Sequence, residues 1–460
     1  MGNNYSEAFI KAIYENPTVY HWCNYTSEFL TARGFQYLPE RENWDGKIKR
    51  GGSYYTTRNG SSIVAFKIGS KWKLGDNGVG VIGCHIDALT AKIKPISKKA
   101  FKQGYRQLGV APYSGGMSSV WWDRDLSIGG RVIVKSQDGS FSTKLAHVEH
   151  PIARIPTLAE HFGKPSEGPF NKETQMTPII GHETTDEDNA TDEEKKSPLY
   201  GRHDIKLLRA IAQNVGVSVS ELYQLELELF DSQPGALGGL DREFMFCPRL
   251  DDKLCSFGAI QALVETSAPS DAINCVALFD NEEIGSLLRQ GAKGGLFQHA
   301  IQRVFQQLGD FDDDYLRQTF ANSFFISSDV THAVNPNFSD SYLENHKPKL
   351  NTGLVVKLDP NGHTTSDGVS TAFIEEVARR TGNKLQYFHI RNDGVSGGTI
   401  GPMFSSATGI RSVDAGIPQL SMHSIRATTG SRDLELGVKM YSGFFNTWTS
   451  VDADFRKGDI

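Results

Sequence analysis

The 460-residue sequence predicts an α/β protein in which a mainly parallel sheet, flanked by helices, is interrupted by an inserted β-rich domain. A chain of this length exceeds the usual size of a single domain. In the first and last parts of the chain, short apolar runs alternate with segments of helical periodicity, a pattern typical of strands buried on both faces. In between, strand-like segments alternate with Gly, Ser and Pro. We therefore expect one domain formed by residues 1–92 and 240–460, and an inserted domain at residues 93–239.

Each expected element follows from a local pattern. Apolar residues recur at steps of three and four from Tyr5 to about Gly34, which predicts a helix. Further helices are expected at 254–264 and 372–380, and a turn in the glycine-rich segment 396–402. Apolar runs predict strands at 61–67, 79–84, 131–135, 276–279, 324–328, 354–358 and 385–390.

Composition and charge exclude several classes of protein. The formal net charge of −6 argues against a general nucleic-acid binder, which needs a basic surface. The five cysteines are odd in number and form no C-x-x-C pair, so we expect no disulfide framework, no cysteine-type zinc site and a reducing compartment. No apolar window is long enough to span a membrane. Gly2 and Ser6 fit the minimal myristoylation pattern, which is short and common.

Acidic and imidazole side chains stand next to most of the expected elements, mainly where strands end. In an open α/β sheet such positions meet beyond the carboxyl ends of the strands. Several carboxylates gathered there would repel one another unless cations lay between them. Imidazole and carboxylate ligands suit zinc, cobalt or manganese, and a bridging carboxylate allows two ions to act together. The side chains in question are His85, Asp87, Asp251, Glu282, Glu283, Asp329 and His423.

Two spacings within this set predict a division of labour. Alternate side chains of an extended chain share a face, so His85 can bind a metal while Asp87 orients it. In the adjacent pair Glu282 and Glu283, one carboxylate can bind metal. The other stays free to accept a proton from water and pass it to a leaving amine.

These motifs, in this order, resemble the M18 family of metallo-aminopeptidases. The resemblance extends from about Ala8 to Phe445 and includes segments similar to the family's vacuolar branch and others similar to its aspartyl branch. The vacuolar branch is the closer of the two. The segments that carry the resemblance are 83–88, 122–126, 154–156, 248–251, 280–285, 289–294, 397–402 and 421–424.

The resemblance implies a role for each matched position. Two divalent metal ions are expected, most simply zinc, with cobalt or manganese as alternatives. His85 and Asp329 would hold one ion, Glu283 and His423 the other, and Asp251 would bridge them. As catalytic residues, Glu282 would be the general base and acid, Asp87 would orient His85, and His161 would enter the active site of a neighbouring subunit.

The resemblance also implies an assembly, substrates and a location. The inserted domain would mediate dimerisation within a tetrahedral homododecamer that acts on peptides. A selective-autophagy receptor is a further expected partner. The chain begins about where the mature enzyme of the vacuolar branch begins, so we expect a cytoplasmic location, with delivery to the vacuole as the alternative. Lys357 and Gly398 would bind substrate, but the preference for an acidic or a neutral, apolar first residue stays open.

Two other functions fit the same residues. A deacylase or carboxypeptidase could use the same metal pair and would accept N-blocked substrates, which an aminopeptidase would not. A structural assembly could keep the fold without activity. Because every expected metal and catalytic position is filled, the sequence favours an aminopeptidase that releases single N-terminal residues.

Overall fold

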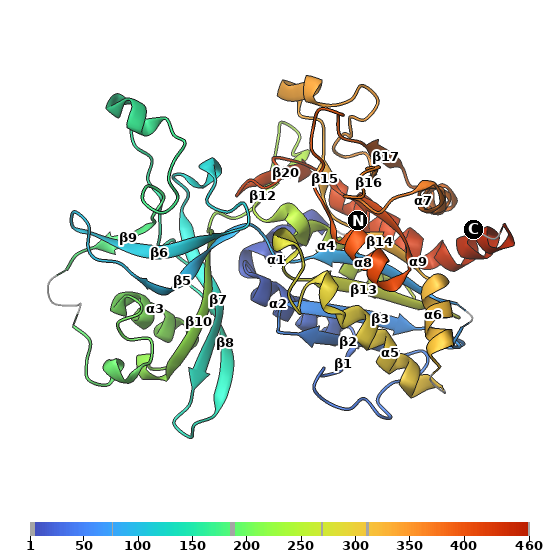
Figure 1. Ribbon diagram of the computed structural model, residues 1–460, viewed down its shortest axis with the longest axis horizontal. Coiled ribbons are helices and arrows are strands. Elements are labelled where there is room, and N and C mark those ends of the chain that lie inside the picture. Colours follow the sequence, from blue (N-terminus) through green and yellow to red (C-terminus); the bar gives the residue numbers. More distant parts are fainter. Residues whose placement is uncertain (1–4, 76, 185–188, 268–269, 310–311, 459–460) are drawn as a thin grey trace.

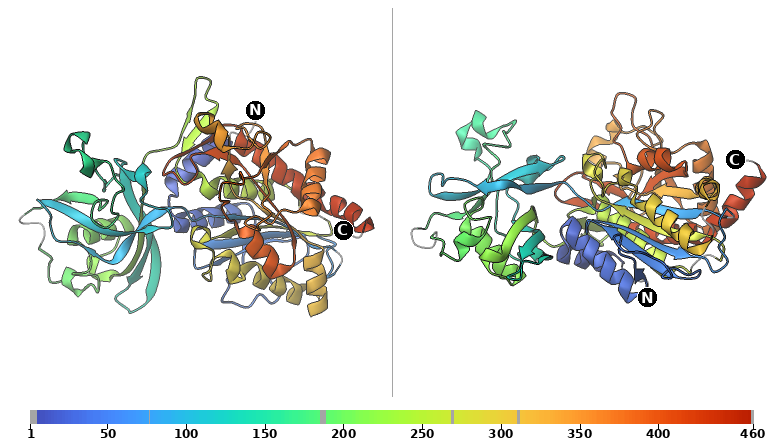
Figure 2. Two further views of the ribbon diagram at one scale, coloured as in Figure 1. Left: turned by 45° about the horizontal axis from the view of Figure 1, so that its top comes forward. Right: turned by 60° about the horizontal axis from the view of Figure 1, so that its bottom comes forward.

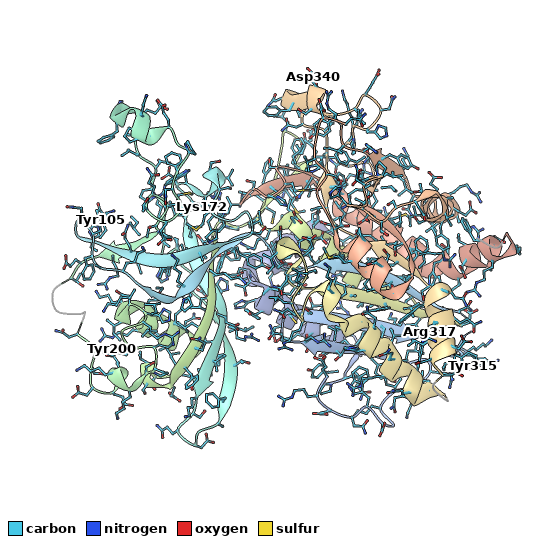
Figure 3. The ribbon with its side chains drawn as sticks, in the orientation of Figure 1. Tyr105, Lys172, Tyr200, Tyr315, Arg317 and Asp340 are labelled. Carbon is cyan, nitrogen blue, oxygen red and sulfur yellow. The ribbon has the colours of Figure 1, made fainter. Side chains whose placement is uncertain are left out.

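The computed structural model describes residues 5–75, 77–184, 189–267, 270–309 and 312–458. The chain forms two lobes joined side by side, and they remain distinct in all three views (Figures 1 and 2). Tyr105 and Tyr200 lie on the smaller lobe, and Tyr315 and Arg317 lie at the opposite end of the molecule (Figure 3). Among the described residues, no helix is both long and apolar enough to cross a membrane. Gly2, with its lipidation pattern, lies outside the described residues.

A nine-stranded mixed sheet forms the centre of the larger lobe. Its middle strands β13, β4, β14 and β18 all run parallel, and antiparallel pairs occur only nearer the edges of this sheet, among the described strands. This confirms the expected α/β fold with a parallel core. In spatial order the strands are β1 (Gln36–Tyr37), β2 (Ser53–Arg58), β3 (Ser62–Ile68), β13 (Ile273–Phe279), β4 (Val79–His85), β14 (Phe324–Ser327), β18 (Arg411–Gly416), β16 (Leu354–Lys357) and β17 (Leu385–Phe388).

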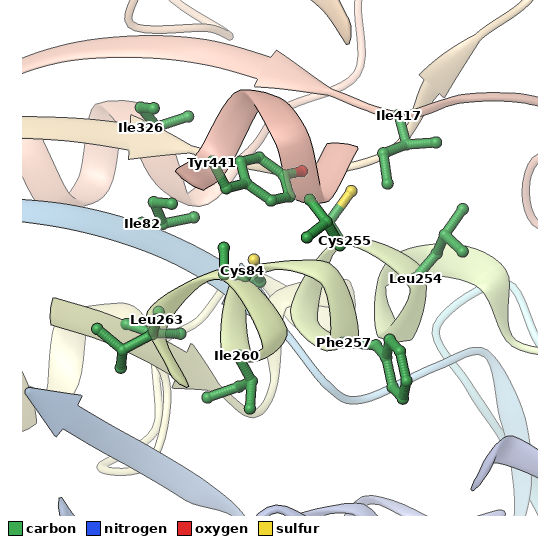
Figure 4. Packing of buried hydrophobic residues seen from close by; sticks show 14 of the residues in the cluster. Ile82, Cys84, Leu254, Cys255, Phe257, Ile260, Leu263, Ile326, Ile417 and Tyr441 are labelled. Carbon is green, nitrogen blue, oxygen red and sulfur yellow. The ribbon is translucent and has the colours of Figure 1, made fainter. Parts of the chain in front are cut away.

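Helices cover both faces of this sheet, which explains why its central strands are apolar without alternation. Along β4, Val79 and Val81 pack into one core, while Ile82 and Cys84 pack into the other. Figure 4 shows the second of these cores, where residues of α4 and of the sheet pack together with Tyr441 of the C-terminal helix. The helices are α1 (Tyr5–Glu15), α2 (Val19–Ala32), α4 (Leu250–Glu265), α7 (Gly368–Thr381) and α9 (Asp433–Lys457) on that side, and α5 (Leu296–Leu308), α6 (Asp313–Ala321) and α8 (Ile400–Thr408) on the other.

The smaller lobe is built on a six-stranded antiparallel sheet whose strands come from residues 90–231. We call it the inserted sheet. Its order is β8 (Phe141–His147), β7 (Leu126–Lys135), β10 (Leu222–Asp231), β5 (Thr90–Lys98), β6 (Tyr105–Tyr113) and β9 (Ile179–His182), and helix α3 (Ile205–Val215) packs on it. β5 begins three residues before the expected boundary at residue 93. The dimerisation role of this lobe stays a prediction.

A small five-stranded sheet pairs the segment that follows the inserted sheet with strands from later in the larger lobe. Its strands are β11 (Ala236–Gly238), β12 (Phe244–Cys247), β20 (Ala427–Gly430), β19 (Pro418–Leu420) and β15 (Thr331–His332). All five cysteines are buried and free, as their number and spacing predicted.

Two expected elements differ in the structure. The single N-terminal helix is instead two helices, because Pro17 lacks an N–H group and disfavours helical geometry in the residue before it. Thr18 caps the second helix by accepting a hydrogen bond from the His21 N–H group. The expected turn at 396–402 ends early, since α8 already begins at Ile400, where the Thr399 hydroxyl accepts the Gly401 N–H group.

Candidate metal centre and active site

The parallel strands at the centre of the large sheet bring imidazole and carboxylate groups to one edge. β13 and β4 are in register with Phe279 opposite His85, and β14 is paired with β4 up to Ser327. His85 therefore ends its strand beside the segments that carry Glu282, Glu283 and Asp329 immediately after theirs. Asp251 reaches the same edge from the start of α4, and His423 from the loop after β19.

The distances show that the expected metal ligands converge. Asp251 Oδ1 lies 3.0 Å from His85 Nε2, and Asp251 Oδ2 lies 3.5 Å from His423 Nε2. His85 Nε2 is 3.8 Å from Asp329 Oδ1, and His423 Nε2 is 3.8 Å from Glu283 Oε2. The Asp251 carboxylate thus stands between two imidazoles, each of which has a further carboxylate beside it.

Glu282 and Asp87 lie near the same imidazole. Glu282 Oε2 is 3.9 Å from His85 Nε2, on the side of the ring that faces the carboxylates. Asp87 lies behind the ring, with its Oδ1 atom 3.2 Å from His85 Nδ1. The Asp87 carboxylate also accepts the N–H groups of Glu282 and Glu283, at 3.1 and 3.2 Å. Asp87 therefore connects the imidazole to the segment that carries the two glutamates.

The carboxylates at this edge crowd one another electrostatically. Burial raises the pKa of Glu282 to about 8, and the neighbouring Asp329 contributes to the rise. Burial also raises the pKa of Glu283 well above its ordinary value, with Asp251 adding to the effect. For His85, burial acts to lower the pKa, but Glu282 and hydrogen bonds with carboxylates outweigh it, and the pKa is well above 6.5. The carboxylates at this edge therefore outnumber the positively charged groups of the protein that lie beside them.

The donors fit divalent metal ions. Imidazole nitrogens and carboxylate oxygens are the ligands zinc takes in hydrolases. His85, Asp251 and Glu283 offer one atom each within 4.8 Å of one another. Glu283 Oε1 is buried and has no hydrogen-bond partner, which is costly for a carboxylate unless a cation meets it.

Sequence reasoning missed Asp252, which lies beside the expected bridging residue. Asp252 forms a second group of possible ligand atoms with His85 and Asp329. Its two oxygens, however, accept the N–H groups of His85 and Val330, at 3.3 and 3.2 Å. These two hydrogen bonds connect the end of β4 with the segment after β14. Asp252 therefore fixes the main chain that carries His85 and Asp329. Its position directly after Asp251 was the only available signal.

A cavity of about 340 Å³ opens in front of the carboxylates. Lys357 and Gly398 both line it, and their role in binding substrate stays a prediction. Lys357 is buried, not a surface residue at the end of its strand. Its ammonium group donates to the carbonyl of Asp329 at 3.2 Å and lies 3.9 Å from the Asp329 carboxylate. The apolar side chains of the lining are Val330, Leu358, Phe388, Ile390, Val395, Met403 and Met422.

His161 does not join these residues within the chain. It lies exposed in a short 3-10 helix, Glu160–Phe162, in the smaller lobe. That segment belongs to the part that projects at the upper left of Figure 1. Its expected place in a neighbouring subunit's site stays a prediction.

Comparison with known proteins identifies the family. Residues 12–445 match the family described as aminopeptidase I zinc metalloprotease (M18). Vacuolar aminopeptidase 1 of Saccharomyces cerevisiae is 51% identical over 462 residues, covering 98% of this chain and 89% of that protein. Aspartyl aminopeptidase of Aspergillus oryzae is 39% identical over 478 residues, covering 96% of each.

Solved structures agree with the sequence comparisons. The crystal structure of prApe1 superimposes with a TM-score of 0.95 at 50% identity, covering 98% of this chain and 96% of that chain. The structure of the S. cerevisiae mApe1 dodecamer gives a TM-score of 0.89 at 46% identity, covering 98% of both. Ape4 in its cryo-EM complex with Nbr1 gives 0.92 at 36% identity, covering 98% of this chain and 87% of that chain. With these matches over nearly its whole length, the chain belongs to the M18 family of zinc metalloproteases and is a metallo-aminopeptidase.

Proposed function

We propose that this protein holds two zinc ions and uses them to release single neutral or apolar residues from the N-terminus of peptides. His85 and Asp329 would bind one ion, Glu283 and His423 the other, and Asp251 would bridge them. The observation that carries the proposal is the Asp251 carboxylate, whose two oxygens face different histidines at 3.0 and 3.5 Å. A single ion could not make use of both imidazoles without leaving part of the acidic group uncompensated.

The side chains around these positions supply the proton transfers. Zinc bound there would lower the pKa of water and polarise the scissile carbonyl. Glu282 accepts the proton of the attacking water at its carboxylate and later donates it to the leaving amine. Its carboxylate lies 3.9 Å from His85 Nε2 and is not among the proposed ligands, which leaves it free for both roles. Asp87 holds His85 from behind through the Nδ1 atom, which keeps Nε2 directed at the site.

The cavity supports the preference for a neutral or apolar first residue. Its lining includes valine, leucine, isoleucine, phenylalanine and methionine side chains. Lys357 is the only lysine or arginine in the lining among the described residues, and Asp329 already engages its ammonium group. An acidic side chain would therefore meet apolar surface and a cation that is already paired, which is unfavourable. Gly398 at the rim adds no side chain that would obstruct entry.

One set of assays tests this function against its alternatives. We expect two zinc ions per chain, loss of activity on chelation and its return with zinc. Among aminoacyl reporters, Leu and Ala should be cleaved faster than Asp and Glu. Faster cleavage of Asp and Glu would refute the proposed preference. Cleavage of N-acetylated peptides instead of free ones would indicate a deacylase or carboxypeptidase, and inactivity with zinc bound would indicate a structural assembly.

We further propose that the protein assembles as a tetrahedral dodecamer in which His161 enters a neighbouring active site. The similarity to the S. cerevisiae mApe1 dodecamer supports the assembly, and the exposure of His161 leaves it available to a second copy. Replacing His161 with Ala should lower turnover without loss of zinc or of assembly. Unchanged kinetics in an intact dodecamer would refute the contribution across subunits.

Similarity also supports a proposal about location and partners. The relatedness to a vacuolar aminopeptidase favours delivery from the cytoplasm to the vacuole. The complex of Ape4 with Nbr1 makes a selective-autophagy receptor a reasonable partner for this chain as well. Imaging of a tagged chain, with and without such a receptor, would test both points.

A further inference from the structure

The hydroxyl group of Tyr113 in the inserted sheet contacts the acidic edge of the large sheet. Tyr113 is the last residue of β6, and its side chain is buried between the two lobes. Its hydroxyl donates a hydrogen bond to Asp87 Oδ2 at 2.8 Å. The hydroxyl also accepts the side-chain amide of Asn281 at 3.2 Å. Tyr113 therefore contacts the residue directly behind His85, although it belongs to the other lobe.

The Asp87 carboxylate is oriented by donors from three directions. The N–H groups of Glu282 and Glu283 reach its two oxygens from the segment after β13. Tyr113 binds Oδ2 from the inserted sheet, and Oδ1 faces His85 Nδ1. The two N–H groups bind one oxygen each, and the tyrosine hydroxyl adds a hydrogen bond from the inserted sheet to Oδ2.

The tyrosine itself is held firmly. Lys92 of the neighbouring strand β5 places its ammonium group 4.2 Å from the centre of the Tyr113 ring, a favourable cation–π geometry. β5 and β6 pair antiparallel here, with Thr90 opposite Tyr113. Asn281 fixes the direction of the hydroxyl by using its acceptor side, which leaves the hydrogen for Asp87. The arrangement is rigid because two elements of the inserted sheet and one loop of the larger lobe define it.

We propose that Tyr113 is a positioning residue by which the inserted sheet sets the orientation of His85 as a metal ligand, acting through Asp87. This inference rests on the proposed zinc centre. A hydrogen bond to a ligand's partner fixes the imidazole tautomer and ring direction and makes the nitrogen a better donor. Replacing a residue that hydrogen-bonds a metal ligand directly typically costs roughly 10–100-fold in metal affinity, so we expect a change one bond further out to cost roughly 3–10-fold. The inserted sheet would thus contribute to zinc affinity without providing any ligand.

The test compares Tyr113→Phe with the same substitution at another buried tyrosine. Tyr54→Phe also removes a hydroxyl from a buried tyrosine, one that accepts the Lys49 N–H group at 2.8 Å on the far strand β2. Zinc dissociation constants are measured by competition with a chromogenic chelator, alongside the thermal midpoint of each metal-free protein. We expect Tyr113→Phe to weaken zinc binding by roughly 3–10-fold and Tyr54→Phe to leave it unchanged. Excess zinc should restore the turnover of Tyr113→Phe, with KM unaltered.

A double-mutant cycle distinguishes action through Asp87 from a general effect. In an Asp87→Asn background the further change Tyr113→Phe should have no additional effect on zinc affinity. Equal zinc affinities of the wild type and Tyr113→Phe would overturn the inference, as would an undiminished effect in the Asp87→Asn background. Failure of the wild type to bind zinc at all would instead refute the proposed metal centre, so the two failures are distinguishable.

Discussion

Some buried carboxylates of both lobes have arginines beside them, whereas those at the edge of the large sheet gather around imidazoles. In the smaller lobe Asp204 pairs with Arg106 and Asp231 lies near Arg124, and in the larger lobe Asp452 pairs with Arg411. At the edge of the large sheet, Asp251 and Glu283 have imidazoles as their nearest basic partners in the described structure. A buried acid beside an arginine is neutralised within the fold, whereas acids gathered without enough cations indicate a site for ions from solution.

The histidines of the two regions repeat the contrast. His85, surrounded by carboxylates, has a pKa well above its ordinary value despite burial, which acts in the opposite direction. His21 packs against His147 where the lobes meet, with ring centres 5.8 Å apart, and burial lowers its pKa to about 4. The same side chain is therefore driven toward the charged form in one place and the neutral form in the other. Environment, not residue type, marks the functional site.

The largest effect is expected from changing the proton acceptor at the acidic edge. Glu282→Gln keeps the size of the side chain but cannot accept a proton, so turnover should fall by about 10²–10⁴-fold or more. Zinc content, measured on the same sample, should stay at the wild-type level because Glu282 is not among the proposed ligands. A variant with most of its turnover would rule out the assigned role, and one that loses zinc would make Glu282 a ligand.

The second-largest effect is expected from breaking a buried ion pair of the smaller lobe. Arg106→Met leaves Asp204 buried without its partner, and removing one member of a buried pair costs about 3–5 kcal/mol. Lys94→Met is the matched control, because Lys94 and Glu173 form an exposed pair worth about 0–1 kcal/mol. Denaturant unfolding of both variants measures the difference. Equal destabilisation would mean that the buried pair has no special importance for this lobe.

A smaller effect is expected from His21 as the pH falls. The pKa of His21 is about 4 in the folded protein, against an ordinary value of 6.5. Between these two pH values, His21 is protonated in the unfolded chain but not in the folded protein. Folding stability should therefore decrease by about 2 kcal/mol from pH 7.5 to pH 5 on account of this residue. Comparing metal-free wild type with His21→Gln isolates this contribution, and His150→Gln at an exposed position serves as the control. A slope that His21→Gln leaves unchanged would contradict the assignment.

The sequence was informative wherever function depends on the ends of strands. The apolar runs predicted the ends of β4, β13, β14 and β16 to within three residues, because strands buried on both faces must be continuously apolar. The chemistry-bearing residues directly after them then followed from the rule that parallel strands end at one edge. Asp251 and His423 do not follow expected strands, and the family resemblance, not the rule about strand ends, supplied their roles as ligands.

Contacts between segments far apart in the chain could not be predicted from the sequence. Tyr113 looks like any strand tyrosine, and only the docking of the inserted sheet on the larger lobe places its hydroxyl beside Asp87. Lys357 likewise follows an apolar strand as a surface lysine would, yet it is buried against Asp329. Such roles depend on three-dimensional neighbours separated by long stretches of chain, and no local pattern records them.

The smallest expected effect concerns the sign of a stability change. In metal-free protein, Glu283→Gln removes a buried carboxylate that has one oxygen without a partner, so stability should rise by about 1 kcal/mol. The same change at Glu226 of the inserted sheet removes the partner of Arg131, and stability should fall by at most about 1 kcal/mol. Denaturation with chelator present measures both stability changes. In excess zinc, Glu283→Gln should become the more destabilising of the two changes because it removes a zinc ligand. If metal-free Glu283→Gln proved less stable than the wild type, the protein would already satisfy this carboxylate by itself, and the charge argument for metal ions at this edge would no longer hold.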